Sequence, residues 1–231
     1  IDYMLTNYDF INHNRIYVLG SSNGGYMAYR LSCDLSHRIT AFTSVIGNMF
    51  LYDDGYDCTD QGRDIPILHI HGTEDPINSY YPGGNSVDIL GDQYLTIIES
   101  IEFWSDYHQY DLMEIDTILS DVSIRYTYSN DSVVSNFEHI KVIGGGHIYF
   151  YGDNYGFSST QEAIDYSLKY ELSDFIFNQE DTNNDGIYNI EDINEVVNHL
   201  LDESQNDSSY DFNSDQNINI FDLLVLIDFI Y

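Results

Sequence analysis

Hydrophobic positions along most of the chain alternate between two periods. Short apolar runs predict buried strands over residues 15–19, 39–46, 65–70, 122–129 and 139–143. Apolar residues at helical spacing predict helices over residues 1–8, 26–33, 94–107 and 163–177. This alternation predicts an α/β fold, with a mostly parallel sheet and helices on both of its faces. Functional side chains in such a fold gather at the carboxyl ends of the strands.

The pattern changes near residue 178, where Asp, Asn and Ile become dominant. Residues 181–192 and 211–222 repeat one another with an offset of 30 residues. Each repeat leads into a segment with helical apolar spacing, over residues 193–201 and 223–231 respectively. A repeated loop and helix predicts a small all-α domain. The predicted domains are therefore residues 1–178 and 179–231.

Acidic residues far outnumber basic ones, with 39 Asp and Glu against 7 Lys and Arg and a formal net charge of −32. Such a field repels phosphate backbones and anionic lipids, so we expect neither a nucleic acid nor a membrane as partner. It suits cation binding and neutral or cationic substrates. Hydrophobic residues still make up 43% of the chain, which is enough for a sizeable core.

A Gly-Ser-Ser-Asn-Gly turn lies between the first predicted strand and the helix that follows it. It fits G-x-S-x-G, the strained strand-to-helix turn that exposes a nucleophilic serine, here Ser22. The backbone N–H of Asn23 would donate to the oxyanion. Ser21 is the rival serine, although it lacks the flanking glycine spacing. The alternative is a Gly/Ser-rich turn without chemistry.

A serine nucleophile needs a histidine base and a carboxylate that orients it, in the chain order Ser, Asp or Glu, His. Asp75 follows the strand over residues 65–70, in the sequence HGTEDP, and His147 follows three glycines after the strand over residues 139–143. The candidate catalytic residues are therefore Ser22, Asp75 and His147. Glu74 is an alternative acid, Asp75 could be a turn residue, and His147 could be a loop histidine.

The remaining histidines and the two cysteines suggest structural roles. His69 and His71 lie on a predicted buried strand and are expected to be core groups with satisfied hydrogen bonds. The others are expected to be structural or solvent-facing: His13, His37, His108, His139 and His199. Cys33 and Cys58 could form one disulfide or remain separate thiols, and the spacing around them does not suit zinc.

Three segments together, GSSNGGYMAYRLSCDLSHRITAFTSVIG, IPILHIHGTEDPINSY and KVIGGGHIYF, resemble the polyhydroxybutyrate depolymerase and feruloyl esterase group of α/β-hydrolases. The resemblance covers roughly residues 1–178. It implies a secreted serine carboxylic-ester hydrolase with Ser22, Asp75 and His147 as its triad, and no cofactor for catalysis. The implied substrate is an ester on a polysaccharide, or a polyester.

Two departures from that family pattern stand out. Family members often carry a Trp soon after the catalytic histidine, where this chain has Ile148, Tyr149, Phe150 and Tyr151. The family also has several strands before the opening helix, together with a loop that gives the second oxyanion donor. This section is absent here and no signal peptide is visible, so we expect a sequence truncated at its N-terminus.

The two repeats place oxygen-bearing residues at positions 1, 3, 5, 9 and 12 of a twelve-residue loop, and a backbone carbonyl at position 7. The first loop offers Asp181, Asn183, Asp185, Ile187, Asn189 and Asp192. The second loop offers Asp211, Asn213, Asp215, Asn217, Asn219 and Asp222. Hard oxygen ligands at this spacing suit Ca²⁺, which we expect to be structural. Position 6, a glycine in the first loop, is Gln216 in the second.

Two loop–helix units without entering helices resemble a type I dockerin. The resemblance implies a cohesin-type scaffold protein as partner. The alternative is a polar Asn/Asp linker. A second function of a different class also stays open, a non-catalytic calcium-dependent attachment protein with a degenerate hydrolase domain.

Overall fold

The computed structural model describes residues 1–8, 10–36, 38–51, 65–83, 93–130, 134–174, 182, 190–201, 210–212 and 217–230. The chain divides into two compact units. One is Arg15–Glu171, and the other combines Ile1–Asn14 with Leu172–Tyr231. The predicted domain boundary near residue 178 lies outside the described residues.

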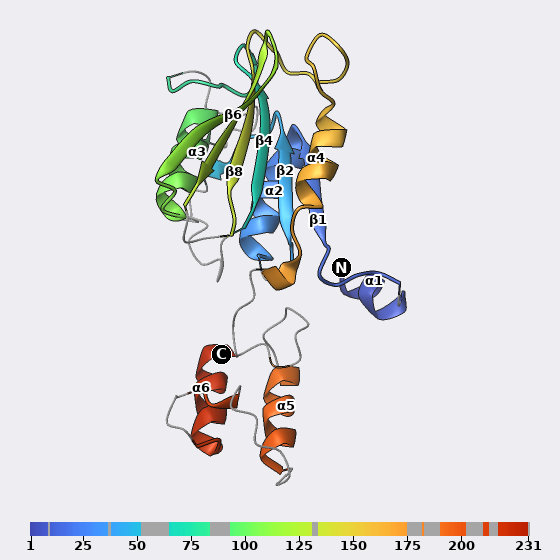
Figure 1. Cartoon of the computed structure of the whole chain (residues 1–231), viewed down its shortest axis with the longest axis vertical. Coiled ribbons are helices and arrows are strands. Elements are labelled where there is room, and N and C mark those ends of the chain that lie inside the picture. The colour runs from blue at the N-terminus through green and yellow to red at the C-terminus, as the bar shows by residue number, and fades with distance from the viewer. Residues whose placement is uncertain are drawn as a thin grey trace. The chain divides into compact units, whose positions relative to one another are not determined.

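The larger unit is built on a six-stranded sheet in the order β1-β2-β4-β8-β7-β6 (Figure 1). Its strands are β1 (Tyr17–Ser21), β2 (Ala41–Val45), β4 (Ile67–Gly72), β6 (Leu112–Ser120), β7 (Ser123–Ser129) and β8 (Phe137–Val142). Strands β1, β2, β4 and β8 pair in parallel, and the β6–β7 hairpin joins β8 antiparallel. The predicted mostly parallel sheet is confirmed.

Burial explains which strands the hydrophobic pattern predicts. Every residue of β2 and β4 is buried, as expected for parallel strands covered on both faces. The pattern does not predict β6, an edge strand. Its Met113, Ile115 and Ile118 are exposed, so the apolar residues of β6 do not mark a core face. A short second sheet pairs β3 (Phe50–Leu51) with β5 (Gln93–Tyr94).

Helices cover both faces of the large sheet. Helices α2 (Asn23–Asp34) and α3 (Ile97–Tyr107) share one face, where Trp104 of α3 stacks on Tyr29 of α2 with ring centroids 6.3 Å apart. Helix α4 (Ser159–Ser167) packs on β2 and β4, and Figure 1 shows it in front of the sheet with α2 behind. The core between α2, α3 and the sheet is rich in aromatic side chains: Tyr29, Phe42, Tyr80, Trp104 and Phe137.

Two predicted helices have different bounds in the structure. The segment predicted from residue 94 becomes helical only at Ile97, because Tyr94 pairs in β5 and Thr96 caps α3. Thr96 and Glu99 form a capping box, which fixes that start. The helix predicted over residues 163–177 spans Ser159–Ser167. Its apolar spacing continues further because Tyr170 is buried although it follows the helix end.

The smaller unit contains α1 (Asp2–Asn7), a 3₁₀ turn over Leu172–Asp174, α5 (Ile190–Leu201) and α6 (Ile220–Ile230). Helices α5 and α6 pack through four apolar side chains, Ile193, Val196, Leu223 and Leu226. Both helices begin three residues before the predicted starts. No helix in the described part of the chain has the length and apolar character needed to cross a membrane.

Cys33 lies buried on α2 and is disulfide-bonded. Its predicted partner Cys58 lies outside the described residues.

Candidate active site

The turn between β1 and α2 holds Ser22 in a strained conformation. Ser22 has φ 52° and ψ −118°, which non-glycine residues rarely adopt outside functional sites. The turn is tight, because a Cβ atom on Gly20 would overlap the carbonyl group of Gly24. A Cβ atom on Gly24 itself would meet open space. The first glycine is therefore the one that the close approach requires, while Gly24 contributes its backbone.

The structure brings the three predicted triad residues together. Ser22 Oγ lies 2.8 Å from His147 Nε2, and His147 Nδ1 lies 2.8 Å from Asp75 Oδ2. His147 therefore accepts from the serine hydroxyl on one side and donates to the carboxylate on the other. The imidazole is 16% exposed, and the Asp75 side chain is fully buried. Of the two alternatives, Ser21 ends β1 and is exposed, and Glu74 is exposed.

Backbone amides fix the Asp75 carboxylate. The N–H groups of Ile77 and Asn78 both donate to Asp75 Oδ1 at 2.8 Å, which leaves Oδ2 for the side chains of His147 and His71. Burial alone would raise the pKa of Asp75. Hydrogen bonds from His71, the Asn78 amide and His147 outweigh burial and lower the pKa to about 2. The carboxylate is therefore ionised throughout the neutral range.

The loops after β4 and β8 are joined by their backbones, and this places acid and base side by side. Glu74 N–H donates to the Gly145 carbonyl at 2.9 Å, and Gly144 N–H donates to Thr73 Oγ1 at 2.9 Å. A Cβ atom on Gly72 would overlap the Gly145 carbonyl. Gly144 has φ 71°, a conformation that favours glycine. The glycines before His147 thus allow the close approach that their sequence suggests.

Asn23, whose backbone N–H is the predicted oxyanion donor, is the first residue of α2. The first amides of a helix have no acceptor within the helix, and they carry its partial positive charge. A negative charge that develops beside Ser22 Oγ would therefore meet a helix N-terminus.

One contact of the triad was not predicted from sequence. His71 is fully buried, as expected for a core group, but its Nε2 lies 3.2 Å from Asp75 Oδ2. The sequence feature that could have indicated this contact is the pair His69 and His71, which share one face of the strand that leads into the Asp75 loop. Spacing alone could not show that this loop turns back onto His71.

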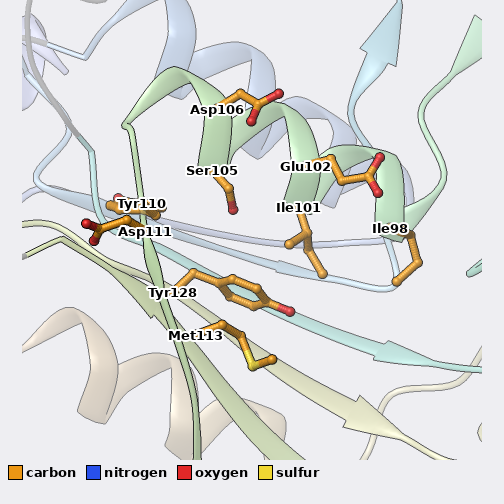
Figure 2. Close-up of a pocket in the computed structure, with 9 residues that line it drawn as sticks. All are labelled: Ile98, Ile101, Glu102, Ser105, Asp106, Tyr110, Asp111, Met113 and Tyr128. Carbon is orange, nitrogen blue, oxygen red and sulfur yellow. The ribbon is translucent and has the colours of Figure 1, made fainter.

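A separate pocket of about 360 Å³ lies between α3 and the β6–β7 hairpin. Figure 2 shows Met113 and Tyr128 of the sheet below α3, with Ile98, Ile101, Glu102 and Ser105 on the helix. Tyr110, Asp106 and Asp111 complete the lining. No predicted site residue lines this pocket.

Five of the predicted calcium ligands are described, Asp192, Asp211, Asn217, Asn219 and Asp222, whereas Asp181, Asn183, Asp185, Ile187, Asn189, Asn213 and Asp215 lie outside the described residues. Asp192 and Asp222, at position 12 of the two loops, are fully buried in the first turns of α5 and α6. Asp192 Oδ1 accepts from Thr182 N–H at 2.9 Å, and Asp222 Oδ2 accepts from Asn219 N–H at 2.7 Å.

These positions fit calcium by the chemistry of their donors. Each buried carboxylate is tied to the loop that precedes its helix, and each offers hard oxygen atoms. Asn217 offers its backbone carbonyl, which here accepts from Asn219 Nδ2. Within the described residues, no three acidic, histidine or cysteine side chains form a complete metal cluster.

Comparisons with known proteins match both parts of the chain. The model of the phospholipase/carboxylesterase family matches residues 1–121, and the model of the dockerin type I domain matches residues 179–231. A bifunctional acetylxylan esterase/xylanase of Neocallimastix patriciarum is 33% identical over 81 residues, which is 35% of this chain and 11% of that protein.

Proposed function

Because the chain belongs to the phospholipase/carboxylesterase family and carries a type I dockerin domain, we propose that it is a serine carboxylic-ester hydrolase carried on a calcium-binding module. The observation that carries the proposal is the unbroken hydrogen-bond series Ser22–His147–Asp75, whose serine lies on a strained strand-to-helix turn. The expected α/β-hydrolase with a dockerin is confirmed. The narrower depolymerase or feruloyl esterase activity stays a prediction.

In the proposed mechanism, Ser22 Oγ attacks the ester carbonyl while His147 Nε2 takes the hydroxyl proton. The Asn23 N–H stabilises the oxyanion of the tetrahedral intermediate. His147 then protonates the leaving alcohol. Water next attacks the acyl-enzyme, while His147 takes a proton from the water and returns it to Ser22 Oγ. Asp75, ionised at neutral pH, keeps the His147 proton on Nδ1 and stabilises the imidazolium form. None of these steps needs a metal.

The proposed substrate is an ester borne by a polysaccharide. The related esterase/xylanase supports this choice, since its name joins acetylxylan esterase and xylanase activities. A formal net charge of −32 also favours neutral polymers over anionic ones. Polyesters are the competing substrate class. Ile77 and Ile148, both exposed and close in sequence to Asp75 and His147, are candidate contacts for the acyl or alcohol group.

The dockerin module suggests how the enzyme is held near its substrate. Type I dockerin domains bind calcium and cohesin-type scaffold proteins. We propose that the oxygen-bearing residues of the two loops, Asp192 and Asp222 among them, hold structural Ca²⁺. We further propose that this protein is secreted and is attached to a scaffold protein outside the cell.

The test is hydrolysis of acetyl, butyryl, feruloyl and 3-hydroxybutyryl esters, free and polymer-bound, by the full-length protein. We expect turnover that falls by roughly 10⁶-fold in Ser22→Ala. The matched control Ser21→Ala removes the neighbouring hydroxyl and should leave turnover almost unchanged. A folded protein with no turnover above Ser22→Ala would overturn the proposal. Calcium-dependent capture by a cohesin would then support the non-catalytic attachment function.

A further inference from the structure

A buried series of side chains extends from the triad into the core. His71 Nε2 lies 3.2 Å from Asp75 Oδ2 and 3.1 Å from the Asn78 carbonyl oxygen. On the other side of the ring, His71 Nδ1 lies 3.1 Å from His69 Nε2. His69 Nδ1 in turn lies 2.6 Å from the Tyr29 hydroxyl on α2. Asp75 is thus contacted by two histidines, His147 toward the solvent and His71 from the core.

The chemistry of these atoms fixes where the protons lie. An ionised carboxylate and a backbone carbonyl can only accept, so His71 Nε2 must carry a proton and donate. A neutral His71 then accepts at Nδ1, and His69 Nε2–H is its donor. His69 Nδ1 accepts from the Tyr29 hydroxyl. All donors therefore point one way, from Tyr29 toward Asp75.

Burial keeps the two inner members of this series, Tyr29 and His69, neutral. Burial raises the pKa of Tyr29 well above its ordinary value, so that its hydroxyl remains a donor. Burial lowers the pKa of His69 well below its ordinary value, so that its ring stays neutral. If His71 Nδ1 carried a proton, His69 would have to accept at Nε2 and donate from Nδ1 to the Tyr29 hydroxyl oxygen. The hydroxyl hydrogen of Tyr29 would then need another acceptor in the core.

We propose that His71 is a positioning residue for the triad, whose Nε2–H holds Asp75 Oδ2 in place and moderates the carboxylate charge that His147 experiences. This inference rests on the proposed function. His69 and Tyr29 serve it by keeping the proton of His71 on Nε2.

The groups around His71 determine through which residue it can influence the triad. Among the described residues, the titratable and charged groups around it are His69 on β4, His139 and Lys141 of β8, and Asp75 and Tyr80 of the following loop. Tyr29 of α2 reaches it only through His69. Asp75 is the one carboxylate in this set. Lys141 Nζ lies 5.5 Å from the centre of the Tyr80 ring. Loss of the His71 donor therefore acts on the triad through Asp75.

The sign of the effect follows from electrostatics. Without the His71 N–H, the Asp75 carboxylate carries more uncompensated negative charge and stabilises the imidazolium form of His147 more strongly. Because the mechanism needs neutral His147, the acid-side midpoint of the kcat/KM profile moves to higher pH. A histidine that only filled space would lower activity without moving this midpoint.

The experiment compares His71→Leu, His71→Gln and His139→Leu in the full-length protein, with folding checked by circular dichroism. His139 is almost equally buried, but its hydrogen bonds go to Tyr80 and the His69 carbonyl rather than to Asp75. In His71→Leu we expect kcat to fall roughly 10- to 100-fold, as for one hydrogen bond to a charged group, with little change in KM. We also expect a midpoint about half a pH unit or more higher. The glutamine amide can replace Nε2–H, so His71→Gln should restore the midpoint, and His139→Leu should leave it unmoved.

A second readout separates this inference from the proposed function. The His147 Nδ1–H proton, hydrogen-bonded to Asp75, should give a low-field proton NMR signal in Ser22→Ala, where no turnover is needed. Adding His71→Leu should shift that signal, whereas adding His139→Leu should not. If the protein shows no Ser22-dependent turnover but the signal shifts, the proposed function fails and the positioning contact stands. An unmoved signal and midpoint in folded His71→Leu would overturn the role of His71.

Discussion

At the residue scale, Asp75 shows how a buried carboxylate can be stabilised by backbone amides and histidines. Two backbone amides and two histidines surround its oxygens, and together they offset the burial that would otherwise favour the protonated acid. The same bonds that orient the carboxylate thus keep it ionised. Asp75 should therefore affect both turnover and acid stability.

The prediction concerns Asp75→Asn. We expect kcat to fall by roughly 10⁴, because an amide that donates to His147 favours the wrong tautomer. The folded-state pKa of Asp75, about 2, lies below its ordinary value. The stabilisation is therefore complete above about pH 4 and is lost as the pH falls toward 2. Urea unfolding between pH 5 and pH 2 should show a weaker loss of stability in Asp75→Asn than in wild type.

Glu74→Gln is the matched control, since it removes the same charge from the exposed neighbour of Asp75. It should keep wild-type turnover and the wild-type acid dependence. The same acid dependence in Asp75→Asn and wild type would contradict the assignment of the low pKa to Asp75.

Sequence spacing predicts Ser22, Asp75 and His147 because each follows a strand, and parallel strands bring their carboxyl ends to one edge of the sheet. The contact between His71 and Asp75 could not be predicted in this way. It depends on the path of the chain from Gly72 to Asn78, where Asn78 closes the loop against His71.

At the element scale, α4 is attached to the sheet by charged side chains. Glu138 of β8, whose side chain is 4% exposed, accepts from Arg125 of β7 at 3.0 Å and from Lys169, just after α4, at 2.5 Å. Arg125 also pairs with Glu162 of α4. Strand hydrophobicity could not predict this network, since it depends on which residues of β7 and β8 lie opposite one another.

We predict that Glu138→Ala lowers the free energy of unfolding by about 1–3 kcal/mol, because the largely buried Arg125 loses one of its two carboxylate partners. Glu171→Ala removes the same charge from an ion pair with Arg15 in which both side chains are 39% exposed. That control should cost about 0–1 kcal/mol. Urea denaturation of both variants is the measurement, and equal losses would argue against a structural role for the buried network.

At the scale of the whole molecule, the proposed catalytic and calcium-binding functions lie in different compact units. Ser22, Asp75 and His147 all belong to Arg15–Glu171, and both repeats belong to the other unit. The repeats predict α5 and α6 from sequence because their spacing occurs twice. The starts of these helices were predicted three residues late, since Ile190 and Ile220 are exposed and do not extend the apolar stripe.

We predict that calcium chelation unfolds the dockerin module and leaves ester turnover unchanged. The buried Asp192 and Asp222 would be left without the cation that favours their burial, so the helical signal should fall. Circular dichroism and turnover, recorded on the same sample with EDTA and then with added Ca²⁺, give the test.

Asp192→Asn should need more calcium to recover its helical signal, whereas Glu191→Gln, the same charge change at an exposed neighbour, should not. Loss of turnover in step with the helical signal would contradict independent units.

The strained backbone at Ser22 has a consequence for directed evolution of this protein. A conformation with φ 52° and ψ −118° disfavours any side chain, and glycine adopts positive φ with little penalty. Libraries screened for heat resistance alone should therefore drift toward Ser22→Gly, while libraries screened for product should retain the serine. At position 22, selection for stability and selection for turnover therefore favour different residues.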